Sequence, residues 1–507
     1  MLRNVASTWM VSMVTIATTY ILMPFVIHTL GTEGYGTWTL IASLTGYISL
    51  LALGVPMACV RYLAGPVAEG DSAQMNKVIG SCAGLYLLLG GAAVAIGTIL
   101  AAVFHLYGIP PVFRTQAGLA YGLMVLYVSA GFIGLLPEGI LYAHLDFVRR
   151  NAVRIVGVLL RLSLTVAFLK LSPSLVALAL VQIGCLVFDF SASWWLIRRR
   201  YPAVRLSLSD FDRSRVRQVL SFSVYVLIMQ AGIRLSFETD ALVIGAFLGV
   251  GAVPYYVVAN SLIVYLMEFV IAIAAVAAPM ATKLAALGKR DELVQIFLKW
   301  SKVALTLTML PGLFLIVLGP RFLARWIDPS FEQPAGQVLQ ILMVSSLVFL
   351  PIRGVALPIL MGLGRPKVPT IAFLMAGILN LAMSVILAGP LGLTGVALGT
   401  AVPNVLFALV VLVLACRELG ISVRHYVQYV VPRAAIGALP VLALLQWFKG
   451  GLQVRDMFGL LVAGSVATAL FAFTWIFYVY RDDPFVDVRT HLLRLRPWGA
   501  GREGGLP

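Results

Sequence analysis

Apolar stretches of about 20 residues recur along this chain from end to end, and each is long enough to cross the ~30 Å hydrocarbon core of a bilayer as a helix. The 507 residues are 61% hydrophobic and 11% charged, whereas soluble globular chains are roughly half apolar and about a quarter charged. The sequence therefore predicts an all-α polytopic membrane protein. Because its loops are too short to form a soluble catalytic domain, we do not expect an enzyme.

Polar, glycine and proline clusters divide the apolar sequence into about fourteen candidate membrane spans. The first follows Arg3; its apolar run is long and lacks a signal-peptide cleavage pattern, so we expect it to stay uncleaved. The expected ranges are 5–28, 35–63, 78–104, 115–141, 151–170, 173–197, 218–247, 253–281, 296–319, 336–361, 370–388, 393–416, 427–447 and 458–480.

Positive charge is distributed unevenly between the two sides of these spans. Of the 37 lysine and arginine residues, 29 fall on the side of the N-terminus and 6 fall on the other side. Lys302 is one of the 29. Cytoplasmic loops carry such an excess, so both termini are expected in the cytoplasm. The net charge of +16 thus reflects topology and gives no indication of nucleic-acid binding.

Two pairs of segments recur at nearly the same offset. Leu30-Gly31 recurs as Leu248-Gly249, 218 residues later, and residues 141–171 align with 360–390 at an offset of 219. These anchors predict two parallel six-helix repeats followed by two extra helices, an arrangement typical of transporters with a central substrate site. The expected domains are an N-lobe (1–197), a basic cytoplasmic linker (198–217), a C-lobe (218–416), helices 13 and 14 (417–480) and a cytoplasmic tail (481–507).

The glycine-rich stretch LGTEGYGTWTL at residues 30–40 precedes a hydrophobic helix, as a phosphate-binding loop does. It lies on the side with few positive charges, carries only the charge of Glu33, and is followed by no lysine. Its counterpart in the second repeat keeps Leu-Gly but not the other two glycines. We therefore interpret it as a turn between the first two spans.

Ionisable side chains inside a membrane are costly and are functional candidates by default. Arg161 and Arg234 lie within spans and predict a cationic cavity that binds an anion such as a phosphate. Glu238 is four residues after Arg234 and shares its helix face, so the two side chains are able to neutralise one another. Asp240 lies on a different face, and Glu268 lies within the eighth span. These acids are candidates for binding protons or sodium, for gating, or for orienting the arginines.

Weaker candidates lie nearer the expected cytoplasmic ends of spans. Glu138 and Asp189 are possible members of the same site, and Arg61 and Arg353 are interface anchors or a basic entry for a lipid phosphate. All of these charges have an alternative interpretation as salt bridges between helices or as side chains that snorkel to the interface. The histidines and cysteines show no metal-ligand or catalytic spacing. No metal or cofactor is expected, apart from a proton or sodium gradient.

Three segments together resemble a known family: residues 30–64, 238–260 and 361–402. They are similar to polysaccharide-transport flippases, which carry O-antigen or exopolysaccharide units, of the multidrug/oligosaccharidyl-lipid/polysaccharide exporter superfamily. The resemblance implies a MATE-like fold of fourteen helices in two lobes that works by alternating access. It also implies movement of undecaprenyl-pyrophosphate-linked oligosaccharide from the inner to the outer leaflet of the bacterial cytoplasmic membrane, driven by an ion gradient. Asp240 stands at the family's acidic position in the seventh helix.

Other functions remain open at this point. Lipid II flippases resemble this fold but carry arginines in the first, second and eighth helices, where this chain offers only Arg61 and, in the eighth, Glu268. Multidrug antiporters of the superfamily use acidic residues in the first lobe, and the first span here has none. A third possibility is a non-transporting scaffold of a polysaccharide assembly complex. The expected partners are an anionic lipid-linked oligosaccharide, membrane lipids, and a polysaccharide polymerase with its glycosyltransferases.

Overall fold

The computed structural model describes residues 2–52, 54–102, 104, 107–207, 211–212, 231–236, 238–274 and 277–485. These residues form helices joined by short turns, with no strand among them, as the predicted all-α fold class requires. The α-helices are α1 (Leu2–Ile48), α2 (Val55–Glu69), α3 (Ser72–Ala101), α4 (Pro111–Ala143), α5 (Phe147–Leu171), α6 (Leu175–Arg200), α8 (Thr239–Phe247), α9 (Val253–Ala274), α10 (Ala277–Ala286), α11 (Arg290–Val317), α12 (Gly319–Trp326), α13 (Pro334–Gly362), α14 (Lys367–Leu419), α15 (Val423–Val430), α16 (Pro432–Gly450) and α17 (Met457–Thr474). Short 3-10 helices are η1 (Ser49–Ala52), η4 (Val250–Ala252) and η5 (Pro329–Phe331), and a π-helical turn, η6 (Trp475–Val479), follows α17.

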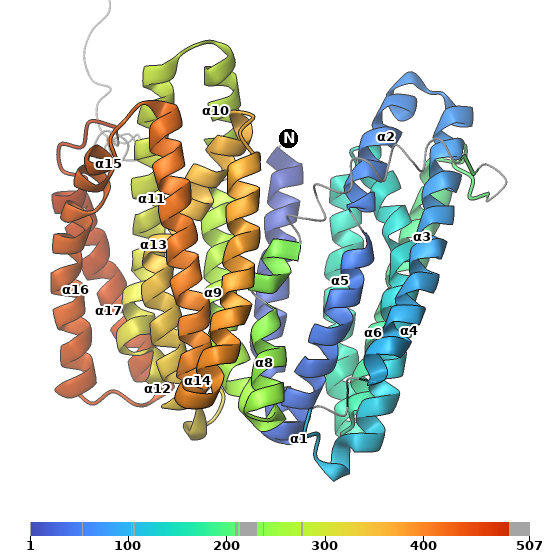
Figure 1. Ribbon diagram of the computed structural model, residues 1–507, viewed down its shortest axis with the longest axis horizontal. Helices are drawn as coiled ribbons and strands as arrows, with labels where there is room; N and C mark the ends of the chain where they lie inside the picture. The colour runs from blue at the N-terminus through green and yellow to red at the C-terminus, as the bar shows by residue number, and fades with distance from the viewer. Residues whose placement is uncertain are drawn as a thin grey trace, which may run out of the picture. The chain divides into compact units, whose positions relative to one another are not determined.

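The helices pack into two compact units, and the first contains Met1–Tyr265, Trp326–Leu342 and Thr370–Asn404. In this unit α4 contacts α1, α2, α3 and α6, while α5 packs against α1 and α6, so that α1–α6 form a bundle (Figure 1). Its interior is apolar, with Leu40 and Ile79 fully buried. The C-terminal half of α1 also contacts α8 and η4. This last contact brings the second span close to the seventh helix.

The second unit contains Leu266–Arg325, Met343–Pro369 and Val405–Pro507. Here α11 contacts α10, α15, α16 and α17, and α16 packs against α17 (Figure 1). The two units follow packing rather than chain order, because they divide α9, α13 and α14. The predicted boundaries of the lobes, linker and tail therefore stay predictions.

Eleven helical stretches of the described residues are long and apolar enough to cross a bilayer. Ala6–Glu69 and Lys367–Leu419 each have the length of two spans, and they change direction at Gly31 and Gly392 respectively. Of the expected span 218–247, only residues 231–236 and 238–247 are described. The chain is thus a multi-pass membrane protein, while the number of fourteen helices and the side of the termini stay predictions.

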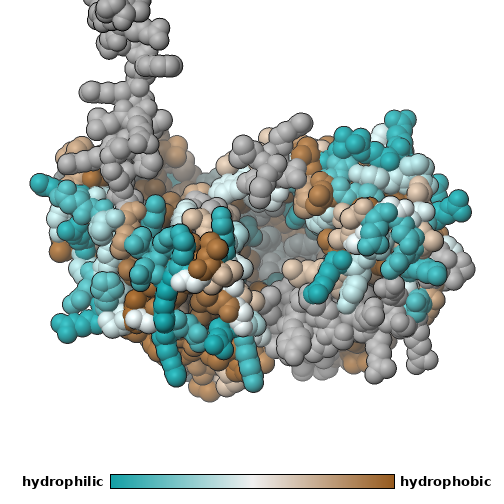
Figure 2. Space-filling model, turned by 90° about the horizontal axis from the view of Figure 1, so that it is seen from above, coloured by the Kyte–Doolittle hydropathy of each residue, from teal (hydrophilic) through white to brown (hydrophobic). Residues whose placement is uncertain are grey.

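The surface has the polarity that a membrane protein requires. Large apolar side chains along the helices are exposed, among them Leu88, Ile99 and Phe458 at 64%, 69% and 75%. The face drawn in the space-filling view carries many hydrophilic residues, with hydrophobic residues beside them (Figure 2). Exposed apolar helix sides match a bilayer environment.

Backbone geometry repeats at the offsets found in the sequence. Gly31 has φ 73° and ψ 172°, and Gly249 has φ 88° and ψ 157°, a conformation that L side chains rarely adopt. Residues 30–40 thus contain the predicted turn, at Gly31. The same offset of 218 relates Gly70 (φ 72°) to Gly288 (φ 69°), a pair that the sequence comparison did not reveal. Both end a helix in the left-handed conformation.

The second anchor repeats in the same way at an offset of 219. Leu145 (φ 57°) and Gly364 (φ 71°) follow the ends of α4 and α13. In both turns the left-handed residue donates its N–H to the carbonyl three residues back, and the next residue donates to the carbonyl five residues back. The two anchors are therefore equivalent in local structure as well as in sequence, although Leu145 occupies a position suited to glycine.

Candidate functional site

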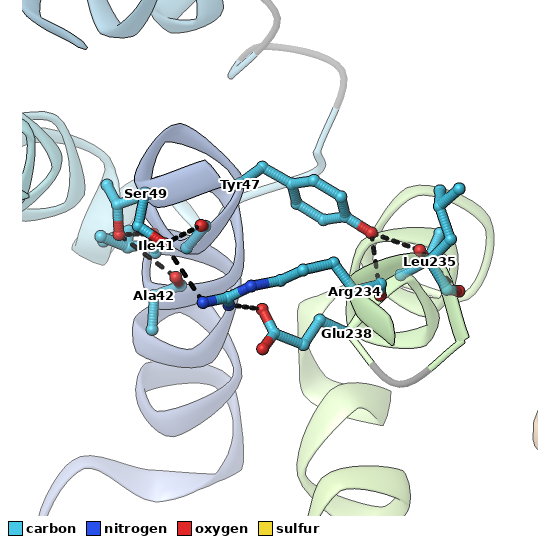
Figure 3. A network of polar contacts seen from close by, with 10 residues as sticks. Ile41, Ala42, Tyr47, Ser49, Arg234, Leu235 and Glu238 are labelled. Atoms are coloured by element: carbon cyan, nitrogen blue, oxygen red, sulfur yellow. Dashed lines mark hydrogen bonds and ion pairs between the residues drawn. The ribbon is translucent and has the colours of Figure 1, made fainter. Parts of the chain in front are cut away.

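Arg234 and Glu238, predicted as an i, i+4 pair, form a salt bridge (Figure 3). Arg234 Nη1 donates to Glu238 Oε2, and Nη2 donates to Ser49 Oγ in η1 at 3.1 Å. The side chains are 29% and 38% exposed. Glu238 therefore compensates the charge of Arg234, and the remaining guanidinium N–H groups make no hydrogen bond within the described residues.

The second span is shaped to receive this pair. At Gly46 a Cβ would lie 3.0 Å from Arg234 Nη1 and 3.1 Å from Glu238 Oε2, so a glycine makes room for the bridge. The hydroxyl of the next residue, Tyr47, contacts Thr239 Oγ1 and lies 3.3 Å from the backbone oxygen of Arg234. Tyr47 and Arg234 thus extend in opposite directions across the space between α1 and the seventh helix (Figure 3).

Asp240, in the first turn of α8, is buried among neutral hydrogen-bond donors. It is 2% exposed. Its Oδ2 accepts from Tyr256 Oη at 2.6 Å and from Thr400 Oγ1 at 2.9 Å, while Ser384 Oγ lies 3.5 Å from Oδ1. No lysine or arginine of the described residues pairs with it, as its position on a different helix face from Arg234 predicts. A buried carboxylate without a counter-charge is unfavourable unless a cation or proton joins it.

Asn380 completes this cluster and leaves one atom unsatisfied. Its Nδ2 donates to Thr400 Oγ1 at 2.9 Å, but its buried Oδ1 has no hydrogen-bond partner in the part of the chain that the structure describes. Asn380 is 1% exposed. The cluster of Asp240, Tyr256, Asn380, Ser384 and Thr400, called the Asp240 cluster below, therefore contains two weakly satisfied acceptors, Asp240 Oδ1 and Asn380 Oδ1.

Three glycines allow α14 to contribute residues from both sides of its kink. Gly392 has φ 60° and reverses the chain. Beyond it, a Cβ at Gly395 would lie 2.1 Å from Leu387 O, and one at Gly399 would lie 2.4 Å from Ser384 Oγ. Small residues four apart let helix backbones approach closely. This approach brings Thr400 onto Asn380.

Arg161 differs from Arg234 because it has no acidic partner. It lies in α5 and is partly exposed, close enough to Tyr127 and Cys185 to interact electrostatically. It makes no hydrogen bond or ion pair with any described residue, and no described contact joins it to Arg234. An intramembrane arginine without a counter-charge is a candidate for binding an anion.

Glu138 and Asp189 belong to an ion cluster that the sequence did not reveal. Both bind Arg150, Glu138 Oε2 at 2.8 Å from Nη2 and Asp189 Oδ1 at 2.7 Å from Nη1. The Arg150 side chain is 6% exposed. The sequence placed Arg150 in a loop, but α5 begins at Phe147 and therefore includes it. The two acids thus have the salt-bridge role that was the alternative interpretation for them.

The remaining candidates lie in α2, α9 and α13. Arg61 is exposed in α2 and Glu268 is exposed in α9. Arg353 lies in α13 with its guanidinium carbon 5.7 Å from the centroid of the Phe349 ring. The functional roles of these three residues stay predictions.

Several residues of the candidate site were not predicted from the sequence because they are uncharged. Tyr47, Tyr256 and Thr400 resemble ordinary residues of apolar helices, and only their contacts single them out. One signal was present: Asn380 and Ser384 are polar residues four apart in an otherwise apolar stretch, and this spacing places them on one helix face. The charged members and, through this spacing, Asn380 and Ser384 were therefore open to prediction, whereas Tyr47, Tyr256 and Thr400 were not.

Solved transporters share this fold. The lipid II flippase MurJ in an inward closed conformation matches with a TM-score of 0.72 at 13% identity, over 95% of this chain and 99% of that chain. A multidrug resistance MATE family transporter of the MOP superfamily in an inward-facing conformation matches with a TM-score of 0.67 at 19% identity, over 81% of this chain and 98% of that chain. These likenesses show the fold.

Sequence comparison adds the family. The uncharacterized membrane protein EpsK of Bacillus subtilis (strain 168) is 23% identical over 401 residues, which cover 76% of each chain. The family described as "Polysaccharide biosynthesis protein" matches residues 1–285. Family and fold together confirm the resemblance predicted from the three sequence segments. Because the match extends over more than half of its length, the chain belongs to the polysaccharide biosynthesis protein family.

Proposed function

We propose that this protein is a flippase that moves undecaprenyl-pyrophosphate-linked oligosaccharide from the inner to the outer leaflet of the bacterial cytoplasmic membrane by alternating access. Membership of the polysaccharide biosynthesis family supports a role in making a surface polysaccharide. The transporter fold supports movement across the membrane rather than chemistry. The observation that carries the proposal is Arg161, an intramembrane cation without an acidic partner among the described residues.

The pyrophosphate of the lipid carrier is the group that these arginines suit. A guanidinium binds phosphate oxygens through paired, charge-assisted hydrogen bonds, which are stronger than neutral ones. Arg161 offers all of its donors, and Arg234 offers those that Glu238 and Ser49 leave open. In this proposal Arg161 is the primary anion ligand, and Arg234 joins it during the transport cycle.

The Asp240 cluster is proposed as the site of the coupling ion. Its donor atoms are a carboxylate, an amide oxygen and hydroxyls, the oxygen ligands that hard cations prefer. A proton on Asp240 Oδ1 turns this atom into a donor for an acceptor such as Asn380 Oδ1, which has no partner among the described residues. A sodium ion held by both oxygens would also satisfy the two together. We take sodium as the ion to be tested first, because these oxygen ligands suit a hard cation, and proton coupling is the other outcome of the test.

Three other functions remain as outcomes to be tested. A lipid II flippase would use the same fold and a pyrophosphate, but a different sugar. A multidrug antiporter would use the Asp240 cluster, although Arg161 and Arg234 would repel cationic drugs. A scaffold for a polymerase and glycosyltransferases would need no transport, and the proposed flippase also associates with these enzymes.

The deciding experiment follows a fluorescent polyprenyl-pyrophosphate oligosaccharide in liposomes that contain the purified chain. A membrane-impermeant quencher reports the outer leaflet, and a sodium gradient supplies the driving force. The wild-type chain should accelerate transfer, and Arg161→Gln should reduce the rate about tenfold to a hundredfold, as expected for a lost charge-assisted bond. Arg154→Gln is the matched control, because Arg154 is exposed on the same helix two turns earlier.

Deletion of the gene separates the alternatives. Loss of surface polysaccharide with lipid-linked units retained on the cytoplasmic face supports the flippase. Unchanged polysaccharide with new drug sensitivity would indicate the antiporter. Accumulation of lipid II would indicate the peptidoglycan substrate, and lost polysaccharide without transfer in liposomes would indicate the scaffold.

A further inference from the structure

Three consecutive residues at the start of α8 have partners in three different places. Glu238 binds Arg234, which in turn donates to Ser49 of η1. Thr239 contacts Tyr47 of α1. Asp240 is bound by Tyr256 of α9 and Thr400 of α14. The first turn of α8 therefore lies between the second span and the Asp240 cluster.

The chain of contacts through this turn is continuous. It leads from Tyr47 to Thr239, then along one peptide unit to Asp240, and from Asp240 to Tyr256, Thr400 and Asn380. All of these residues belong to the first packing unit. A small displacement of Asp240 therefore also displaces Thr239, its neighbour in the chain, and with it the contact to Tyr47.

The two hydroxyls at the junction have two hydrogen-bonded arrangements. Tyr47 and Thr239 supply one hydroxyl proton each, and the backbone oxygens of Arg234 and Leu235 lie 3.3 Å and 3.1 Å from them. Either Tyr47 donates to Thr239 and Thr239 to the Leu235 oxygen, or Thr239 donates to Tyr47 and Tyr47 to the Arg234 oxygen (Figure 3). The two arrangements differ only in the direction of the hydroxyl protons, and both keep Tyr47 hydrogen-bonded to the first turn of α8.

We propose that Tyr47 is the positioning residue that couples the cation at the Asp240 cluster to the second span. The inference rests on the proposed cation site and adds the route by which its occupancy acts. A cation that draws Asp240 Oδ1 and Asn380 Oδ1 together holds the first turn of α8 in place, and Tyr47 then holds α1 against it. Without the cation the turn is released, and the Tyr47 contact is lost with it. Binding and contact therefore favour one another reciprocally.

Hydrogen exchange of the purified full-length chain tests this route without measuring transport. Exchange in residues 41–48 and 239–247 is compared in NaCl and in KCl at equal ionic strength. In the wild-type chain sodium should slow exchange in both segments by about fivefold or more, the lower end of ordinary coupling. Tyr47→Phe should keep the sodium effect in 239–247 and lose it in 41–48. Asp240→Asn should lose it in both.

Two further variants separate coupling from mere structural support. Thr239→Val removes the partner hydroxyl with little change of shape and should reproduce Tyr47→Phe. Tyr35→Phe makes the same change elsewhere in α1 and should leave both sodium effects intact. In the liposome assay, Tyr47→Phe should lose the stimulation of transfer by a sodium gradient, and Tyr35→Phe should retain it.

The possible results separate the coupling role of Tyr47 from the sodium site on which it rests. A sodium effect in 41–48 that survives both Tyr47→Phe and Thr239→Val overturns the role of Tyr47 and leaves the cation site standing. No sodium effect on the wild-type chain overturns the sodium site and the coupling together. Neither result bears on anion binding by Arg161.

Discussion

Three arginines of the first packing unit show how the surroundings of one residue type set its role. Arg150 has two carboxylate partners, Arg234 has one, and Arg161 has none among the described residues. A buried charge that is fully paired is structural, because removing either side leaves an uncompensated ion. A charge that lacks a partner is available to a ligand. The structure thus separates Arg150, whose charge is compensated by two carboxylates, from Arg161 and Arg234, the two arginines proposed to bind the anion.

The Arg150 cluster should be essential for folding. Arg150→Met leaves Glu138 and Asp189 facing one another without a cation, and breaking such a buried pair costs about 3–5 kcal/mol. Thermal unfolding in detergent should show a large loss of stability. Adding Glu138→Gln and Asp189→Asn to the same chain removes both stranded charges and should recover most of the loss.

The neighbouring Arg149 provides the control for this prediction. Its side chain is 45% exposed and pairs with Asp146, a buried carboxylate that also lies 3.5 Å from Arg200 Nε and accepts from Tyr201 Oη. Because Asp146 keeps these two partners and a pair with a half-exposed arginine contributes roughly 0–1 kcal/mol, Arg149→Met should unfold near the wild-type temperature. Equal unfolding temperatures for Arg149→Met and Arg150→Met would show that the buried cluster does not stabilise the fold.

At the scale of elements, hydropathy predicted the helices well and their charged ends poorly. The expected span 151–170 begins one residue after Arg150, and Lys302 is counted with the charges of the N-terminal side although it lies within the expected span 296–319; α5 and α11 include both residues. Their carboxylate partners lie far away in the chain, the Lys302 partner being Asp483. A sequence shows that a charge lies near the end of a span, but not whether a distant acid will cover it. The pairing of helices has to be known first.

Comparison of the repeated turns predicts a stabilising substitution. Leu145 is left-handed, with φ 57°, where its counterpart is Gly364, and its side chain is 71% exposed. The left-handed conformation costs an L residue roughly 1–2 kcal/mol, partly offset by the ~0.5–1 kcal/mol entropy cost of a glycine. Leu145→Gly should therefore stabilise the chain by up to about 1 kcal/mol in thermal unfolding. Gly364→Leu should destabilise it, and opposite signs would refute the equivalence of the turns.

A buried ion pair fixes the end of the last described helix. Lys302 Nζ donates to Asp483 Oδ2 at 2.5 Å and to Val479 O, at the end of η6, at 3.2 Å. Tyr429 also donates to Asp483 Oδ1, at 2.8 Å. A π-helical turn shifts the backbone register, and such turns often mark functional positions. Here η6 precedes the anchor that ties residues 480–485 to α11.

This anchor should weaken in acid. Burial raises the pKa of Asp483, but hydrogen bonds from Lys302, the Phe485 N–H and Tyr429 outweigh burial, so the pKa lies below the ordinary 3.8. A carboxyl with a lowered pKa contributes stability above the unfolded value and loses it as the pH falls through the folded value. The stability advantage of the wild-type chain over Asp483→Asn should be constant near neutral pH and shrink below about pH 4. Unfolding curves followed by tryptophan fluorescence check this, and an advantage independent of pH would contradict it.

At the scale of the whole molecule, the two repeats have the same backbone turns at equivalent positions but different polar side chains. The offset of 219 that equates Leu145 with Gly364 also equates Arg161 with Asn380. One repeat thus places a fixed positive charge where the other places a ligand of the proposed cation site. The glycine pattern made the repeat predictable, but this division of roles depends on contacts that only folding creates.

The same symmetry identifies where the two repeats meet. A Cβ at Gly36 would lie 1.8 Å from Val250 O and 3.3 Å from Cδ of Pro254, and one at Gly251 would lie 3.5 Å from Cγ of Glu33. Gly36 with Pro254 and Glu33 with Gly251 are both pairs of equivalent positions, 218 residues apart. Equivalent residues touch one another only near the axis that relates the repeats. This contact is therefore expected to separate when the lobes rock against one another.

A disulfide across this axis should stop the cycle. In the double variant Glu33→Cys/Gly251→Cys, the sulfur of residue 33 takes the place of the Glu33 Cγ, which lies 3.5 Å from the Cβ position of residue 251. The two sulfurs are therefore close enough for a disulfide to form after side-chain rotation. Mild oxidation should cross-link the chain and halt transfer in the liposome assay, and a thiol reductant should restore it. Each single variant should be insensitive to oxidation. Full transfer by the cross-linked chain would mean that alternating access proceeds without separating the repeats here, and the moving contact would then have to lie away from the axis.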